Sequence, residues 1–95
     1  MAIEFSWNPD KAASNRQKHG VSFDEAATAF DDAVAAIRPD PRHSVGEERW
    51  VLLGQSAIGR TLVVMFTERD EDCIRVISAR RATARERRSY EEGFR

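Results

Sequence analysis

Four kinds of side chain in this sequence, Arg, His, Glu and Tyr, have the chemistry needed to cut a phosphodiester bond in RNA. Cleavage without a metal ion needs a base for the 2′-hydroxyl, an acid for the leaving oxygen, and fixed cations for the charge that builds on phosphorus. Histidine and glutamate can transfer protons, whereas arginine keeps its charge and can only bind. The 95 residues contain no metal-binding motif, phosphate-binding glycine loop or nucleophile elbow. We therefore predict neither a cofactor nor a metal site.

The candidates for proton transfer are His19 and Glu48. His19 comes directly before a glycine at the end of a predicted helix, where it could instead only complement the negative end of the helix dipole. Glu48 opens a predicted strand and could instead pair with a neighbouring strand. His43 lies within residues 39–46, which two prolines and a glycine keep irregular, and we assign it to substrate binding.

The candidate phosphate ligands are three arginines at the ends of predicted strands. Arg80 closes the last strand, although it could instead form an ion pair with Glu86. Arg49 and Arg60 stand at the starts of two other strands. We expect Arg49, Arg60 and Arg80 to converge on one exposed pocket and to clamp a single scissile linkage. Further contacts to RNA are assigned to Lys18, His43, Arg81 and Tyr90; the tyrosine could instead pack along a stripe with Phe94.

Positive charge gathers at the C-terminal end of the chain. Residues 73–95 hold seven arginines against three glutamates, a net of +4, so the remaining residues sum to −5 within the formal net charge of −1. Such a basic end suggests a surface for phosphates or for an acidic partner. The other interpretation is a solvated helix face whose ion pairs contribute little. The arginines are Arg75, Arg80, Arg81, Arg85, Arg87, Arg88 and Arg95.

Length and composition indicate one domain over residues 1–95, with a mass of 10.8 kDa. Cys73 is the single cysteine, so no disulfide can form within the chain. No apolar stretch is long enough for a membrane, and no signal segment stands at the N-terminus. We expect a cytoplasmic protein with no membrane partner.

Cap residues and apolar spacing predict three helices. Asn8 and Pro9 begin the first, which ends at Gly20; Ser22 and Glu25 form a capping box for the second, through residue 30. Thr83 and Glu86 form another capping box, for a terminal helix that reaches about residue 92.

Five strands complete the predicted order β-α-α-β-β-β-β-α. They cover residues 3–7, 33–38, 49–55, 61–67 and 74–80. The short links between the last three favour antiparallel pairing. The last strand carries apolar residues on both faces, which predicts a central or doubly covered position. We therefore expect an α+β fold with helices packed on a small antiparallel sheet.

Short motifs spread over nearly the whole chain are informative in combination. They include Lys18-His19-Gly20-Val21, His43-Ser44, Glu48-Arg49, Gly59-Arg60, Ile77-Ser78-Ala79-Arg80 and Tyr90-Glu91, with Phe5, Trp7, Lys11, Asn15, Phe23, Glu25, Ala26, Phe30-Asp31, Asp40, Ala82 and Glu86-Arg87. In combination these residues resemble the BrnT family, toxins of type II toxin–antitoxin modules.

The resemblance implies a RelE-like toxin fold and an endoribonuclease that cleaves RNA to inhibit translation. It also implies a cognate ribbon–helix–helix antitoxin (BrnA-like) that neutralises the toxin and represses the shared operon, so that operator DNA is contacted only through the antitoxin. The alternative is a non-catalytic module that binds protein or nucleic acid through its basic C-terminal face. We expect an acidic surface of the antitoxin to meet that face.

Overall fold

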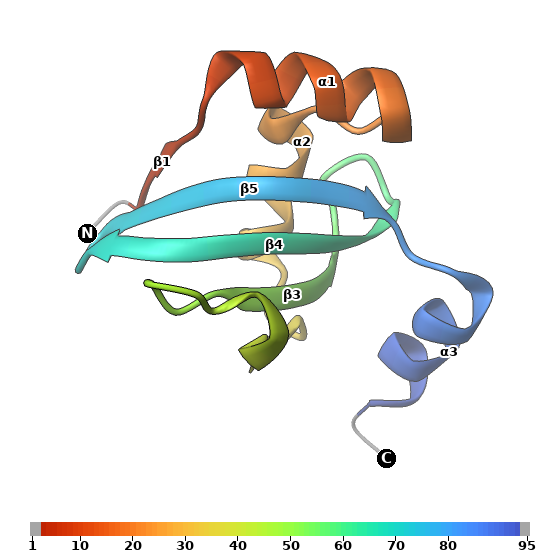
Figure 1. Cartoon of the computed structure of the whole chain (residues 1–95). Coiled ribbons are helices and arrows are strands. Elements are labelled where there is room, and N and C mark those ends of the chain that lie inside the picture. Colours follow the sequence, from red (N-terminus) through yellow and green to blue (C-terminus); the bar gives the residue numbers. More distant parts are fainter. Residues whose placement is uncertain (1–2, 94–95) are drawn as a thin grey trace.

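A five-stranded sheet in the order β1-β5-β4-β3-β2 forms the centre of the computed structural model, which describes residues 3–93 (Figure 1). Two short 3-10 helices, η1 and η2, interrupt an element order that otherwise confirms the predicted β-α-α-β-β-β-β-α. The elements are β1 (Glu4–Ser6), α1 (Pro9–His19), α2 (Phe23–Thr28), η1 (Ala29–Asp31), β2 (Ala36–Pro39), η2 (Pro41–His43), β3 (Trp50–Gln55), β4 (Thr61–Asp70), β5 (Cys73–Arg81) and α3 (Ala84–Glu92).

The first and last helices begin as their cap residues predict. The Asn8 side chain accepts hydrogen bonds from the amides of Asp10 at 2.9 Å and Lys11 at 3.1 Å, and α1 ends at Gly20 with a φ of 69°. In α3, the Thr83 hydroxyl accepts from the Glu86 amide while the Glu86 carboxylate accepts from the Thr83 amide. Local sequence therefore fixes where these two helices start.

The capping box predicted for α2 is only half formed. The Ser22 hydroxyl accepts a hydrogen bond from the Glu25 amide at 3.0 Å, as expected. The Glu25 carboxylate does not accept a hydrogen bond from the Ser22 amide. It accepts instead from Ser56 and Arg60, which follow it by 31 and 35 residues. The α-helix also ends at Thr28 and continues as η1, so the predicted helix through residue 30 is divided in two.

The sheet is mixed rather than purely antiparallel, which corrects one detail of the prediction. Strands β2 to β5 form an antiparallel meander. Strand β1 instead pairs in parallel with β5, and Phe5 faces Ile74 across that pairing. The two helices that follow β1 carry the chain to β2 at the opposite edge, and the meander then returns it to β5; parallel strands need a long connection of this kind.

A bulge in β5 explains its unusual pattern of apolar residues. Met65 pairs with Ser78, whereas the next residue, Phe66, pairs with Val76, so Ile77 is an extra residue in the strand. Val76 and Ala79, three positions apart, are therefore both buried in the same core. The prediction of a central strand is confirmed, since β5 lies between β1 and β4.

The two faces of the sheet are covered differently. On one, here called the helix face, Leu52, Leu62, Val64 and Phe66 pack under α1 and α2 in the main core. The other, here called the open face, carries the alternate residues of the strands. Helix α3 follows the end of β5 (Figure 1) and contacts β3. Within residues 3–93, no helix combines the length and apolar character that crossing a membrane requires. Phe94 and Arg95, named above, lie outside the described residues.

Buried Asn15 fastens α1 to β5. Its side-chain amide donates to the carbonyls of Ala79 at 2.8 Å and Val21 at 3.1 Å, and its side-chain oxygen accepts from the Ala79 amide at 3.1 Å. Because the side chain satisfies both backbone groups of Ala79, it pairs with the strand much as a neighbouring strand would. The end of β5 that carries Arg80 is thereby fixed against the first helix.

Candidate functional site

Three arginines of the sheet project from the open face. Arg75 pairs with Thr67, Arg80 pairs with Val63, and Arg38 pairs with Val51. Val63 and Val51 each lie between residues that belong to the core of the helix face, and Thr67 directly follows Phe66 of that core. Because side chains alternate along a strand and paired residues share a face, the three guanidinium groups are carried on the open face.

Arg49 joins this set from the segment that leads into β3. Its amide donates to the Ser44 hydroxyl at 2.9 Å, and its carbonyl accepts from the Asp40 amide at 2.8 Å. Alternation from Trp50 places the side chain on the open face. The Arg49 Nε is buried and has no hydrogen-bond partner among residues 3–93. An orphaned charged donor of this kind is costly unless an anion or water satisfies it.

We call Arg38, Arg49, Arg75 and Arg80 the arginine face. Sequence reasoning found Arg49 and Arg80 but missed the other two. Arg75 and Arg80 are five positions apart, which puts them on opposite faces of a regular strand; the bulge at Ile77 brings them to the same face. The charge cluster at residues 73–95 included Arg75, but only the bulge shows that it belongs with Arg80.

Arg80 also forms the ion pair that the sequence offered as its alternative role. Its Nη1 and Nη2 donate to the two carboxylate oxygens of Glu86 at 2.7 and 2.9 Å. This bidentate bond lowers the pKa of Glu86 to about 2 and raises the pKa of Arg80. The Arg80 side chain remains 42% exposed, so the pair fixes its direction and leaves part of the guanidinium open to solvent.

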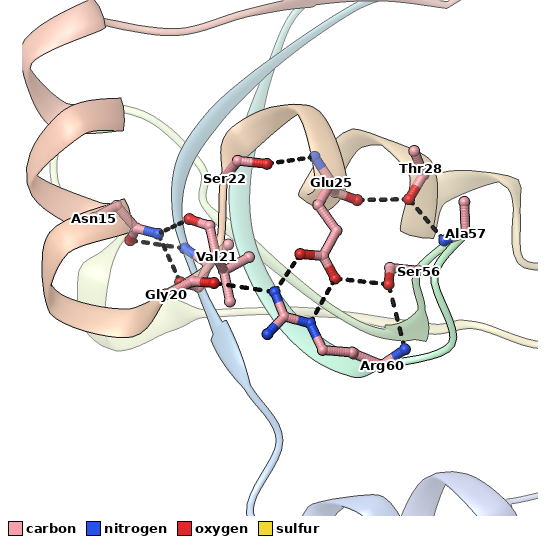
Figure 2. Close-up of polar contacts among 10 residues, drawn as sticks. Asn15, Gly20, Val21, Ser22, Glu25, Thr28, Ser56, Ala57 and Arg60 are labelled. Carbon is pink, nitrogen blue, oxygen red and sulfur yellow. Dashed lines mark hydrogen bonds and ion pairs between the residues drawn. The ribbon is translucent and has the colours of Figure 1, made fainter.

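Arg60 lies on the opposite side of the sheet from Arg49 and Arg80, contrary to the expected single pocket. Figure 2 shows its guanidinium bound by the Glu25 carboxylate, with Nε donating to Oε2 at 2.9 Å and Nη2 donating to Oε1. Nη2 also donates to the Gly20 carbonyl at 3.0 Å. The reason is positional: Arg60 shares the alternation of Leu62 and Val64, which face the helices.

The Arg60–Glu25 pair belongs to a larger polar cluster at the β3–β4 turn (Figure 2). The Ser56 hydroxyl donates to Glu25 at 2.8 Å, and the Thr28 hydroxyl accepts from the Ala57 amide at 2.9 Å. The Glu25 side chain is only 9% exposed, and its pKa is lowered chiefly by the hydrogen bond from Arg60. This cluster ties α2, the turn after β3 and the start of β4 together.

Three other predicted residues lie at the Arg60 end of the molecule. Lys18 and His19 are exposed in the last turn of α1. Arg81 pairs with Leu62 of the core face, and its charge helps to lower the pKa of Glu25. The position of His19 in the last turn of α1 matches its helix-cap alternative. The structure does not bring Lys18, His19 or Arg81 onto the arginine face.

Glu48 and His43 lie in the segment before β3. Exposed Glu48 precedes Arg49 directly and lines a hollow at the edge of the sheet, together with Thr67 of the open face and with Trp50 and Glu68 of the helix face. The His43 side chain is 55% exposed, and its Nδ1 is 2.8 Å from the Asp40 carboxylate. That contact orients the imidazole ring and leaves its second nitrogen available.

Tyr90 contacts the rest of the molecule through its hydroxyl and its ring, while its predicted stripe partner Phe94 lies outside the described residues. Its hydroxyl donates to the Asp32 carboxylate at 2.5 Å. Burial and this hydrogen bond raise the pKa of Tyr90 to about 12. The ring also lines a hollow of about 160 Å³ with Arg38 and Leu53, where α3 meets the open face. Tyr90 therefore fixes α3 beside the arginine face.

Comparison with known protein families matches residues 7–86 to "Ribonuclease toxin, BrnT, of type II toxin-antitoxin system". The chain belongs to the BrnT family. A crystal structure of the Brucella abortus ribonuclease toxin, BrnT, superposes with a TM-score of 0.68 at 21% sequence identity, covering 86% of this chain and 99% of that one. A comparison with curated proteins found no match.

Membership of the BrnT family identifies the chain as a ribonuclease toxin of a type II toxin–antitoxin system. RNA is its substrate and an antitoxin its partner. The similarity to the Brucella structure confirms the α+β fold that the sequence predicted. Among residues 3–93, no group of three or more His, Cys, Asp or Glu side chains is arranged to hold a metal ion.

Proposed function

We propose that this BrnT-family toxin is a metal-independent endoribonuclease that cleaves RNA on the arginine face. Arg49, Arg75 and Arg80 hold the scissile phosphate, and Arg38 holds a neighbouring one. Glu48 takes the proton from the attacking 2′-hydroxyl, and His43 gives a proton to the leaving oxygen. Cleavage arrests translation by removing RNA that the ribosome needs.

The observation that carries this proposal is the buried, unpartnered Nε of Arg49 beside other arginines of the open face. Guanidinium groups bind phosphate oxygens in pairs of hydrogen bonds. A phosphate on this face would satisfy the orphaned donor and would balance positive charges that have few acidic partners. Fixed cations stabilise the pentacovalent phosphorus more than the ground state, because more negative charge develops there.

We assign the proton transfers to two side chains of the segment that leads into β3. The 2′-oxygen attacks phosphorus as its proton passes to Glu48, and the bond from phosphorus to the 5′-oxygen breaks. The departing oxygen takes a proton from the imidazolium of His43, which Asp40 orients through Nδ1. The products are a 2′,3′-cyclic phosphate and a free 5′-hydroxyl.

The partner assignments extend the family resemblance. We propose that the antitoxin is a ribbon–helix–helix protein, and that operator DNA is bound through it rather than by the toxin. An acidic antitoxin segment placed over the arginine face would compete directly with RNA, since both would use the same guanidinium groups.

The test is cleavage of a labelled RNA by purified toxin in the presence of EDTA, with the product ends identified by mass spectrometry. We expect cyclic-phosphate ends, and a loss of about 100-fold in rate for Glu48→Gln. The matched control is Glu92→Gln, which removes an exposed carboxylate from α3. Cleavage that stops with EDTA and returns with Mg²⁺ would contradict metal independence, and equal rates for Glu48→Gln and the parent would remove Glu48 from the mechanism.

The non-catalytic alternative has its own observation. Exposed Arg85 and Arg88 line a shallow hollow on α3, away from the strands that carry the arginine face. A binding module would use this basic surface without cutting. Toxin that binds RNA tightly but leaves it intact, and that loses binding in an Arg85→Ala, Arg88→Ala variant, would favour this second function.

A further inference from the structure

The helices do not cover the whole helix face of the sheet. At the end that carries the β4–β5 turn, a hollow of about 310 Å³ opens beside η1. Its apolar lining comes from Ile3, Phe30, Ile37, Trp50, Phe66 and Ile74. The Phe30 ring packs against Phe66 at 4.9 Å and Phe5 at 5.2 Å between ring centroids. These aromatic contacts fix the walls, so the hollow is formed before anything binds.

Apolar surface around this hollow is in contact with water. Ile37 on the edge strand β2 is 54% exposed, and Ile3 is 49% exposed. Single exposed apolar residues are common, but a group of them around a concave surface marks a place where another protein binds. Burial of these side chains by a partner would remove that contact with water.

The charge beside the hollow selects the kind of partner. Glu68 and Glu71 line it, and Asp70 and Asp72 are their neighbours in the sequence, so residues 68–72 hold four carboxylates and the single cation Arg69. This concentration of negative charge repels RNA and favours a polypeptide that carries Lys or Arg beside its apolar residues. The acidic end of the molecule is thus suited to a protein partner, in contrast to the arginine face.

The same features decide between possible occupants. Strand addition at β2 is restricted, because the edge strand has four residues and Pro39 offers no N–H. A second copy of this chain, related by a two-fold axis, would place one acidic rim against the other. A basic and apolar segment held through its side chains fits both observations.

We propose that this hollow is the anchoring site of the antitoxin, and that its occupant is an antitoxin segment with an apolar side chain flanked by Lys or Arg. The inference rests on the proposed function only in taking the partner to be an antitoxin. It separates anchoring from inhibition, because the hollow lies on the helix face and the arginine face lies on the other side of the sheet. The antitoxin therefore reaches both faces of the toxin.

The test measures the affinity of the purified toxin for the antitoxin encoded beside its gene, by calorimetry. Ile37→Asp should weaken binding about tenfold or more, and Glu71→Lys about threefold. The matched control is Ile58→Asp, which changes a 70% exposed isoleucine in the β3–β4 turn, at the other end of the sheet. RNA cleavage by the free variants should equal that of the parent, because none of these residues lies on the arginine face.

Two results would overturn the inference. One is an antitoxin affinity of Ile37→Asp equal to that of the parent. The other is a parent toxin that self-associates, loses self-association on Ile37→Asp, and keeps its antitoxin affinity, since a second copy would then be the occupant. If the parent toxin fails to cleave RNA, the proposed function fails, while the affinity comparison still decides where the antitoxin binds.

Discussion

Arg60 and Arg49, on opposite sides of this sheet, have opposite hydrogen-bond environments. On the helix side, Arg60 donates to Glu25 through two nitrogens and to the Gly20 carbonyl as well. On the open side, the buried Nε of Arg49 has no partner among residues 3–93. The same guanidinium group acts as a structural brace where carboxylates and carbonyls surround it, and keeps an unsatisfied donor where they do not. Residue type alone therefore does not distinguish Arg60 from Arg49; the hydrogen bonds around each guanidinium group do.

The largest expected effect comes from removing a free guanidinium. Arg49→Ala and Arg75→Ala should each lower the rate of RNA cleavage by about 100-fold, because each removes a cation that stabilises the charge on phosphorus. The melting temperature should change little, since neither side chain forms an ion pair with a carboxylate among residues 3–93. Arg16→Ala on α1 is the control. Full cleavage by Arg49→Ala would break the contrast between the two sides.

Arg60→Lys should chiefly destabilise the fold. Lysine cannot reproduce the two-pronged bond to Glu25, and a largely buried carboxylate would lose its partner, at a cost of about 2 kcal/mol in the free energy of unfolding. Urea titration measures this loss, and cleavage per folded molecule should equal that of the parent. A variant that unfolds like the parent but no longer cleaves RNA would instead place Arg60 among the phosphate ligands.

Acid should weaken the contact that orients Arg80. The pKa of Glu86 is about 2 in the folded chain and 4.5 ordinarily, so its ionised form is favoured by folding. The resulting stability is fully present above pH 4.5 and is lost as the pH falls toward 2. The difference in unfolding free energy between the parent and Glu86→Gln should shrink on passing from neutral pH to about pH 3. A constant difference would show that Glu86 acts only through its capping hydrogen bonds.

The smallest effect is expected for Tyr90→Phe, which removes the hydrogen bond to Asp32 and should cost about 1 kcal/mol. Tyr90 is the single tyrosine of the chain, so the near-ultraviolet absorbance of phenolate reports it alone. It should titrate with a pKa of about 12, with circular dichroism followed to confirm that the protein stays folded. Ordinary titration of the folded chain near pH 10 would show that the hydrogen bond does not hold α3 in place.

Local signals gave the helices, and long-range contacts decided the rest. The caps at Asn8, Gly20 and Thr83 depend on residues within one turn, which a sequence displays directly. Glu25 stands at the position that a capping box requires, but its carboxylate does not cap the helix. Arg60, 35 positions later, binds that carboxylate more strongly than the helix cap does. The parallel pairing of β1 likewise depends on where the chain crosses the sheet, which no local pattern records.

The candidate site was partly visible for the same reason. Arg49 and Arg80 stand at strand ends, where their positions suggested function. Arg60 stands at a strand end too, but the alternation of side chains along the strand puts it on the other face of the sheet. Arg75 was missed because a regular strand, in which side chains alternate between faces, puts it on the face opposite Arg80. The bulge in β5 breaks that alternation.

The extra residue in β5 makes the pairing of that strand as important as its composition. If β5 kept all its residues but paired with β4 without the bulge, every residue after Ile77 would turn over. Arg80 would then point toward the helices and Ala79 toward solvent, so a slip of one position in the pairing would remove Arg80 from the arginine face without changing a single amino acid. Deleting Ile77 itself would leave Arg80 where it is, because only the extra residue would be lost.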